Sequence, residues 1–448
     1  MSTLTLKKLA VRGAFWTVAN YGTSQILRFG GNLLLTRLLY PEFFGLMALV
    51  NIFVIGLKLF SDVGIGLSIV QNKRGEEPAF VNTAWTIQVI RGFLLWGLCL
   101  LIAYPISLLY DNAQLLWLLP MVGVSTILDG FSAMAPFQLE RRLDLSKLMF
   151  LELTTQMIHL IVMIVWAYLS PTILAIVVGG WVSGIVRMVL TYRLIPGYRN
   201  YFKWDKTAAS EIFAIGRWVF LSTALTFLAE QADRLLLGRL LSLELLGIYG
   251  IALMMGDVPR QIAMALGHRV ILPAASKLVD LPRAELRRKI LPHRLKLLLL
   301  LMLGILILAG GGDLIVNFLY DERYAAAAWM LPILALGMWP RLLCATIEAS
   351  LYAIGKMQYT TFANFCRLIS TTVGISIGFY FFQVPGAIVA VSLNDFFYYI
   401  SVSFGLHREG LGCLRQDAQV TSYLVGILLL MMFVRMRLGL GLPFEGMF

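Results

Sequence analysis

The chain has 448 residues, of which 59% are hydrophobic and 14% are charged, and its formal net charge is +12. Soluble domains carry roughly 25% charged residues, so this composition excludes an ordinary soluble protein. Apolar runs long enough to cross a bilayer core of about 30 Å recur along the chain. The sequence also lacks the segments of about ten alternating residues that are typical of transmembrane barrels. We therefore predict an all-α polytopic membrane protein.

Thirteen apolar segments are predicted to form helices. Six lie near residues 12–36, 43–70, 82–108, 114–138, 147–169 and 172–195. Six more lie near residues 211–240, 244–270, 292–319, 326–352, 359–382 and 384–405, and the last lies near 420–434. Basic residues concentrate in alternate loops, which is the positive-inside pattern and places the N-terminus in the cytoplasm. The last segment departs from it, because a thirteenth span would put Arg435 and Arg437 outside.

The positive charge is explained by these loops, because most of it lies where topology signals belong. Contact with anionic lipids fits there, whereas nucleic-acid binding is not indicated. The four cysteines and four histidines are scattered, so neither a disulfide framework nor a metal centre is predicted. A phosphate-binding GxxxxGK[ST] loop is missing from the sequence, which argues against ATP hydrolysis at a Walker-type site. The sequence indicates no cofactor.

One sequence motif occurs twice in the chain. LLLTRLLYPEFFGL begins at Leu33 and LLLGRLLSLELLGI at Leu235, and an offset of 202 aligns their Arg, Glu and Gly residues. The predicted helices between the copies are even in number, so both halves insert with the same orientation. This is a parallel internal repeat. We therefore expect two six-helix bundles at residues 1–205 and 206–406, with a substrate cleft between them, and a loop with an extra apolar segment at 407–448.

Both copies of the repeat belong to longer stretches that resemble a known family. LLLTRLLYPEFFGLMALV with LFSDVGIGLSIVQNK, and ADRLLLGRLLSLELLGIYGIA in the second half, resemble the polysaccharide biosynthesis flippases, in particular the colanic-acid-type exporters. These belong to the multidrug/oligosaccharidyl-lipid/polysaccharide exporter superfamily. The resemblance implies its two-bundle, MATE-like fold and an undecaprenyl-pyrophosphate-linked oligosaccharide as substrate. It also implies a bacterial inner membrane, a monomer, and a polysaccharide polymerase with export machinery as partners. Members with twelve or fourteen spans are common, so thirteen is a departure.

Basic residues inside the predicted spans are the candidates for binding a lipid-linked sugar diphosphate. Charges within spans are costly and usually face a cavity or a partner, and arginine can hold phosphate oxygens bidentately. Four arginines lack a carboxylate three or four residues away and are favoured on that ground: Arg28, Arg91, Arg341 and Arg367. Three further candidates have a carboxylate nearby that could simply neutralise them: Lys58, beside Asp62, and Arg234 and Arg260.

Carboxylates within the spans are candidates for coupling transport to an ion gradient. They are Asp62, Asp129, Asp257, Glu348 and Asp395. A desolvated carboxylate binds a proton more readily, and such a group could also bind Na⁺. Neutralisation by a basic neighbour is the competing interpretation for each of them.

Three classes of function remain to be compared. A flippase working by alternating access fits the cations in the spans. A multidrug or cation antiporter of the same fold should be rich in acids instead. A membrane polymerase or glycosyltransferase needs catalytic residues on a sizeable non-cytoplasmic loop, and those loops are short here. We therefore predict a transporter and not an enzyme.

Overall fold

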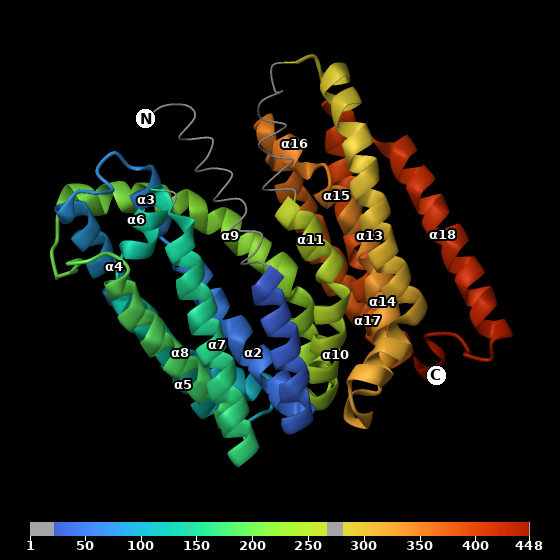
Figure 1. Ribbon diagram of the computed structural model, residues 1–448, viewed down its shortest axis with the longest axis horizontal. Helices are drawn as coiled ribbons and strands as arrows, with labels where there is room; N and C mark the ends of the chain where they lie inside the picture. The colour runs from blue at the N-terminus through green and yellow to red at the C-terminus, as the bar shows by residue number, and fades with distance from the viewer. Residues whose placement is uncertain (1–21, 143, 267–280, 448) are drawn as a thin grey trace. The chain divides into compact units, whose positions relative to one another are not determined.

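The computed structural model describes residues 22–142, 144–266 and 281–447. It divides into two compact units, Met1–Ala224 and Leu225–Phe448. All regular elements in the described ranges are helices (Figure 1). This agrees with the predicted all-α class, and the predicted domain boundaries remain a prediction.

The first unit consists of a helix at 22–38 and the helices that follow it. They are α2 (Pro41–Phe60), α3 (Ile65–Gln71), α4 (Pro78–Leu109), α5 (Leu115–Phe131), α6 (Ala135–Arg141), α7 (Leu145–Leu169) and α8 (Leu174–Arg193). Proline at the first position of α2 and α4 explains where they begin, because proline needs no hydrogen bond there. α4 packs along α5 and α7 along α8, as Figure 1 shows.

Helix α9 (Lys206–Leu240) begins in the first unit and ends in the second. The other helices of the second unit are α10 (Leu243–Gly256), α11 (Val258–Leu266), α13 (Arg283–Leu319), α14 (Ala327–Gly337), α15 (Trp339–Ala345), α16 (Glu348–Ala353), α17 (Gln358–Arg408) and α18 (Leu414–Arg437). Within this unit α14 packs against α10, α13 and α17, and it is largely buried.

Where the structure describes them, the thirteen predicted segments fall on helices or on groups of short helices in series. Residues 12–21 of the first segment and 267–270 of the eighth lie outside the described residues. In the described part of the chain, eight helices are long and apolar enough to cross a membrane, and the pair α5–α6, bent by 58°, would make nine. The chain is therefore a multi-span membrane protein. The number of crossings stays a prediction, because several predicted spans are broken into shorter helices.

The repeated motif has the same structure in both copies. Two residues separate the helix at 22–38 from α2, and two separate α9 from α10, at the same offset of 202. Leu35 and Leu39 are buried, and so are Leu237 and Leu241. Arg37 and Arg239 are both exposed. Sequence, helix ends and burial therefore repeat together at this turn.

A second repeated feature is that the same helices are broken in each half. The second predicted span is interrupted between α2 and α3 and again between α10 and α11. The fourth is interrupted between α5 and α6 and again between α14, α15 and α16. At the first break Gly64 has φ 67°, and its N–H donates to the Asp62 carboxylate at 2.9 Å. A positive φ favours glycine, which has no Cβ.

Helix α17 is two predicted spans joined at a sharp kink. Its residue Gln383 has φ 53° and ψ −138°, far from helical values. The two limbs, 358–382 and 384–408, meet where Gly378 approaches the backbone of Gly386 so closely that a Cβ on either would overlap the other's carbonyl group. The limbs therefore form a hairpin in which glycine lets backbone contact backbone.

The segment before α9 is fixed by polar residues of α4. The backbone N–H groups of Tyr201, Lys203 and Asp205 donate to side-chain oxygens of Asn82, Thr86 and Thr83 at 3.0–3.1 Å. The pKa of Asp205 falls to about 2, because the carboxylate accepts hydrogen bonds from the Thr207 hydroxyl, from backbone N–H groups and from Arg74. This carboxylate holds the start of α9.

Candidate functional site

The predicted site residues gather at the helix breaks. Seven of the twelve lie within two residues of a broken helix end: Lys58, Asp62, Asp129, Asp257, Arg260, Arg341 and Glu348. Non-helical backbone at membrane depth is tolerated where it is buried in protein or lines a water-filled cavity. Broken helices commonly form the substrate and ion sites of transporters. The breaks therefore define the candidate site.

In the first unit the charges at the breaks contact one another. The Lys58 ammonium lies 2.7 Å from the Asp129 carboxylate, which joins the end of α2 to the end of α5. Arg91 on α4 donates to the Ser61 hydroxyl at 2.8 Å and to the backbone carbonyl of Lys58. The alternative that Lys58 is neutralised by Asp62 is wrong about the partner, because Asp62 accepts from Gly64 instead.

In the second unit an ion pair crosses the hairpin of α17. Arg367 on the first limb lies 2.9 Å from Asp395 on the second, and the two side chains are 13% and 4% exposed. Next to this pair, Asn394 donates to the Thr371 hydroxyl at 3.0 Å. Two limbs that already touch through glycine therefore also share a buried pair of opposite charges.

A second buried group lies at the breaks around α15. The Arg341 guanidinium lies 3.7 Å from the Glu348 carboxylate and 3.8 Å from the centre of the Tyr398 ring. The Tyr398 hydroxyl donates to Glu348 at 3.0 Å. Arg341 is 6% exposed, and its Nε and one terminal nitrogen make no hydrogen bond in the described structure. Asp395 is within electrostatic range of Arg341, so this group and the α17 pair are neighbours.

The remaining basic candidates each have a polar partner three residues away. Arg260 forms an ion pair with Asp257 and lies 3.9 Å from Glu230 on α9. Arg234 donates to Gln231 at 3.0 Å. Arg28 donates to Gln25 and is exposed.

The basic candidates for substrate binding and the acidic candidates for ion coupling therefore contact one another. Arg341 and Arg367 were favoured because no carboxylate lies three or four residues away, but the fold supplies Glu348 and Asp395 from further along the chain. Lys58 and Arg260 likewise contact Asp129 and Asp257. Four of the predicted substrate-binding cations thus contact four of the predicted ion-coupling acids. Whether they bind substrate or ions stays a prediction.

Two buried ion pairs between α13 and α18 were not predicted from the sequence. Arg294, with its side chain fully buried, lies 2.6 Å from Asp417, and Arg435 lies 2.6 Å from Asp313. Arg294 also donates to Thr346, Gln416 and the carbonyl of Leu343. The signal was present for one pair, because Asp313 and Arg435 each interrupt an apolar run.

One of these pairs accounts for Arg435, one of the two arginines that depart from the positive-inside pattern, whereas Arg437 is exposed. Arg435 is buried and neutralised by Asp313, so it is not a free cation in a loop. The pairs join residues 294 to 417 and 313 to 435, so α13 and α18 run parallel over about 28 Å at 1.5 Å per residue. That length is close to the bilayer core of about 30 Å. Ion pairs near both ends of α18 therefore join it to α13.

Comparison with known proteins agrees with this architecture. A family model described as "Polysaccharide biosynthesis protein" matches residues 34–329, more than half of the chain. The chain belongs to this polysaccharide biosynthesis family. The match confirms the family resemblance noted in both copies of the repeat.

Curated relatives of this chain include transport and biosynthesis proteins. The succinoglycan biosynthesis transport protein ExoT of Rhizobium meliloti is 23% identical over 83% of this chain and 74% of its own length. The teichuronic acid biosynthesis protein TuaB of Bacillus subtilis is 21% identical over 61% of this chain and 57% of its own. The lipopolysaccharide biosynthesis protein WzxC of Escherichia coli is 21% identical over 62% and 56%. The chain thus matches little more than half the length of the last two.

Solved structures share the fold. The lipid II flippase MurJ in an inward-closed conformation has a TM-score of 0.69 at 14% identity, over 93% of this chain and 92% of its own. An inward-facing multidrug resistance MATE transporter has a TM-score of 0.65 at 12% identity, over 89% and 96%. At these identities the likeness shows the fold alone, and it confirms the predicted MATE-like exporter fold.

Proposed function

We propose that this family member is a secondary transporter of the bacterial cytoplasmic membrane, with its N-terminus in the cytoplasm. It flips undecaprenyl-pyrophosphate-linked oligosaccharide repeat units by alternating access, for the synthesis of exopolysaccharide, capsule or O-antigen. The observation that carries this proposal is the set of ion pairs at broken helices within apolar spans. The relatives named as transport and polysaccharide biosynthesis proteins support the substrate class.

The ion pairs suggest how an anionic headgroup and an ion gradient are coupled. In this structure Asp395 and Glu348 form ion pairs with Arg367 and Arg341. When a proton or Na⁺ binds the carboxylate, the guanidinium loses its partner and becomes available to the diphosphate, whose oxygens it can hold bidentately. Binding of the ion and binding of the substrate then favour each other, as linkage requires.

The test separates a binding role from a structural one. Arg367→Ala leaves Asp395 buried without its partner, which by itself destabilises a protein. The double variant Arg367→Met with Asp395→Leu removes both charges and keeps the volume, so it should fold. We expect the double variant to reach the membrane in normal amounts and still to accumulate lipid-linked repeat units in a strain lacking the native gene. Arg239→Gln, at the exposed turn, is the matched control and should restore export.

Export by the double variant would contradict the assignment of Arg367 as a headgroup ligand. The same pair of experiments applies to Arg341 and Glu348. Normal export in the gene-deleted strain itself, with no accumulated intermediate, would contradict the flippase proposal as a whole.

A multidrug or cation antiporter is the second candidate, favoured by the likeness to the MATE transporter. Increased susceptibility of the deletion strain to cationic drugs, with normal polysaccharide export, would support it. The proposal assigns no catalytic step to this chain, and its proposed partners are a polysaccharide polymerase and export machinery. We propose a monomer, which gel filtration with light scattering would test.

A further inference from the structure

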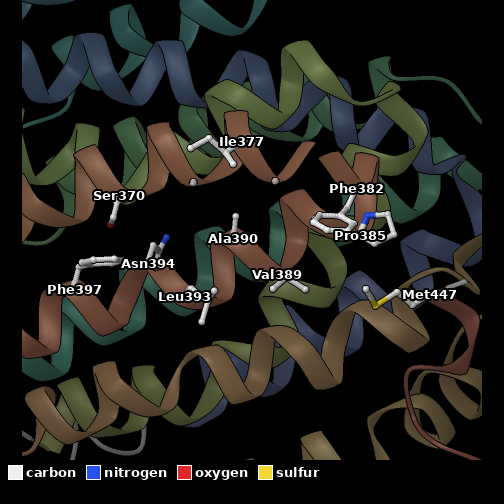
Figure 2. Close-up of a pocket in the computed structure, with 13 residues that line it drawn as sticks. Ser370, Ile377, Phe382, Pro385, Val389, Ala390, Leu393, Asn394, Phe397 and Met447 are labelled. Atoms are coloured by element: carbon white, nitrogen blue, oxygen red, sulfur yellow. The ribbon is translucent and has the colours of Figure 1, made fainter. Parts of the chain in front are cut away.

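A groove of about 670 Å³ runs along the hairpin of α17 (Figure 2). It lies between the two limbs, from Ser370 and Phe397 at one end to Phe382, Pro385 and Met447 at the other. Ser370 and Phe382 are about 18 Å apart along the helix at 1.5 Å per residue. The groove therefore extends over more than half of a bilayer core of about 30 Å.

The floor of the groove is made by small residues. Gly374, Gly378, Gly386 and Ala390 line it where the limbs touch. A Cβ added to Gly374 would meet the Ala390 methyl group at 3.6 Å, so the limbs are in ordinary van der Waals contact there. Close contact without side chains leaves a shallow channel with a smooth bottom, and a larger residue at these positions would fill it.

The walls of the groove are apolar and exposed. Ile377, Phe382, Leu393 and Phe397 stand along its two sides with exposed fractions between 49% and 71%. The hairpin is one of the elements apolar enough to lie in a membrane. Exposed apolar walls of this kind suit an alkyl or polyprenyl chain.

One end of the groove is polar and leads to a charge. Ser370 and the buried Asn394 line that end. Arg367 lies one helical turn before Ser370, whose hydroxyl donates to the Arg367 carbonyl at 3.0 Å. Asp395, the partner of Arg367, follows Asn394 directly. An amphiphile with its chain in the groove would thus have an anionic headgroup at the end where a guanidinium lies.

We propose that this groove holds the polyprenyl chain of the lipid-linked oligosaccharide, with the diphosphate toward Arg367. The inference rests on the proposed function for the identity of the substrate. Phospholipid chains are as apolar as the groove walls, so apolarity alone does not select an occupant. Selection comes from the length of the groove and from the Arg367 guanidinium near one end, which together suit an anionic lipid with a long chain.

The experiment measures contact between the groove and a polyprenyl lipid directly. The full chain carries the photo-crosslinking residue p-benzoylphenylalanine at position 393 in the groove wall, or at position 373, which is exposed on the same hairpin outside the groove. Each protein is reconstituted in vesicles of phosphatidylethanolamine and phosphatidylglycerol with radiolabelled undecaprenyl phosphate. We expect labelling at 393 to exceed labelling at 373 by roughly tenfold, equivalent to about 1.4 kcal/mol of preference.

Two further measurements establish specificity. Ala390→Phe fills the channel and should reduce the labelling at 393 to the level at 373, whereas Val373→Phe, the matched control, should leave it unchanged. Unlabelled undecaprenyl phosphate should compete, and added phosphatidylglycerol should not. Equal labelling at both positions, or equal competition by phosphatidylglycerol, would overturn the proposal in favour of an ordinary lipid contact.

The outcome is distinguishable from failure of the proposed function. If undecaprenyl phosphate labels the groove but the deletion strain exports normally, the flippase proposal fails while the polyprenyl site stands. If Ala390→Phe abolishes labelling and export continues at the normal rate, the groove has no part in transport and the inference is wrong, whereas the flippase proposal survives.

Discussion

Replacement of Arg435 by alanine should destabilise the second unit strongly. The Arg435 and Asp313 side chains are 6% and 15% exposed, and Arg435 also donates to the Gly310 carbonyl at 2.7 Å. Removal of one partner leaves the other charge buried, which costs about 3–5 kcal/mol. For a unit of about 220 residues this corresponds to a fall in Tm of roughly 6–20 °C.

The assay is thermal unfolding of the purified protein in detergent, followed by tryptophan fluorescence. Arg437→Ala is the control, because Arg437 is exposed on the same helix and its guanidinium lies 5.2 Å from the centre of the Phe433 ring. Loss of such an exposed contact costs about 0.5–1 kcal/mol. The double variant Arg435→Leu with Asp313→Leu should recover most of the lost Tm, because neither charge is then buried alone. Equal Tm shifts for Arg435→Ala and Arg437→Ala would refute the reasoning.

Three further predictions concern the remainder of the chain. In a double-mutant cycle on Tm, Lys58→Ala should couple to Asp129→Ala by about 0.2–1 kcal/mol, as expected for a partly exposed pair, and not to Asp62→Ala; coupling to Asp62 alone would contradict the observed pairing. Gly378→Val should prevent the two limbs of α17 from closing, so that protease susceptibility of the hairpin rises, and unaltered cleavage would argue against the backbone contact. The folded-state pKa of Asp205 is lowered from 3.8 to about 2. The contribution of this carboxylate to stability is therefore complete above pH 3.8 and is lost as the pH falls through 2. In urea unfolding, Asp205→Asn should lose less stability than the unmodified protein between pH 3.8 and pH 2, and identical pH profiles would contradict the assignment.

The helices could be predicted from the sequence because each is an apolar run of the required length. The internal repeat could also be predicted from the sequence, because Arg37 and Arg239 recur in register with a Glu and a Gly. The breaks were harder, because the single predicted span 244–270 runs through Asp257, Pro259 and Arg260, where α10 ends and α11 begins. A hydropathy pattern records burial from water and carries little information about helix continuity.

Pairing of charges could be predicted only where the partners share a helix turn. Asp257 and Arg260 are three residues apart and do pair. Arg367 and Asp395 pair across a hairpin, and Arg294 and Asp417 pair between helices far apart in the chain. Such partners are selected by helix packing, so spacing along the sequence does not identify them. For this reason the choice of Arg341 and Arg367 as cations without a nearby acid rested on an incomplete criterion.

The two ion pairs on α13 also set an order of assembly. Asp313 is separated from Arg435 by 122 residues, and synthesis at about 5–20 residues per second delays the second residue by about 6–24 s. Until α18 emerges, α13 carries both an arginine and an aspartate without their final partners. The biogenesis of this unit is therefore completed only by its last long helix, and a chain truncated before Asp417 would retain two uncompensated charges in the membrane.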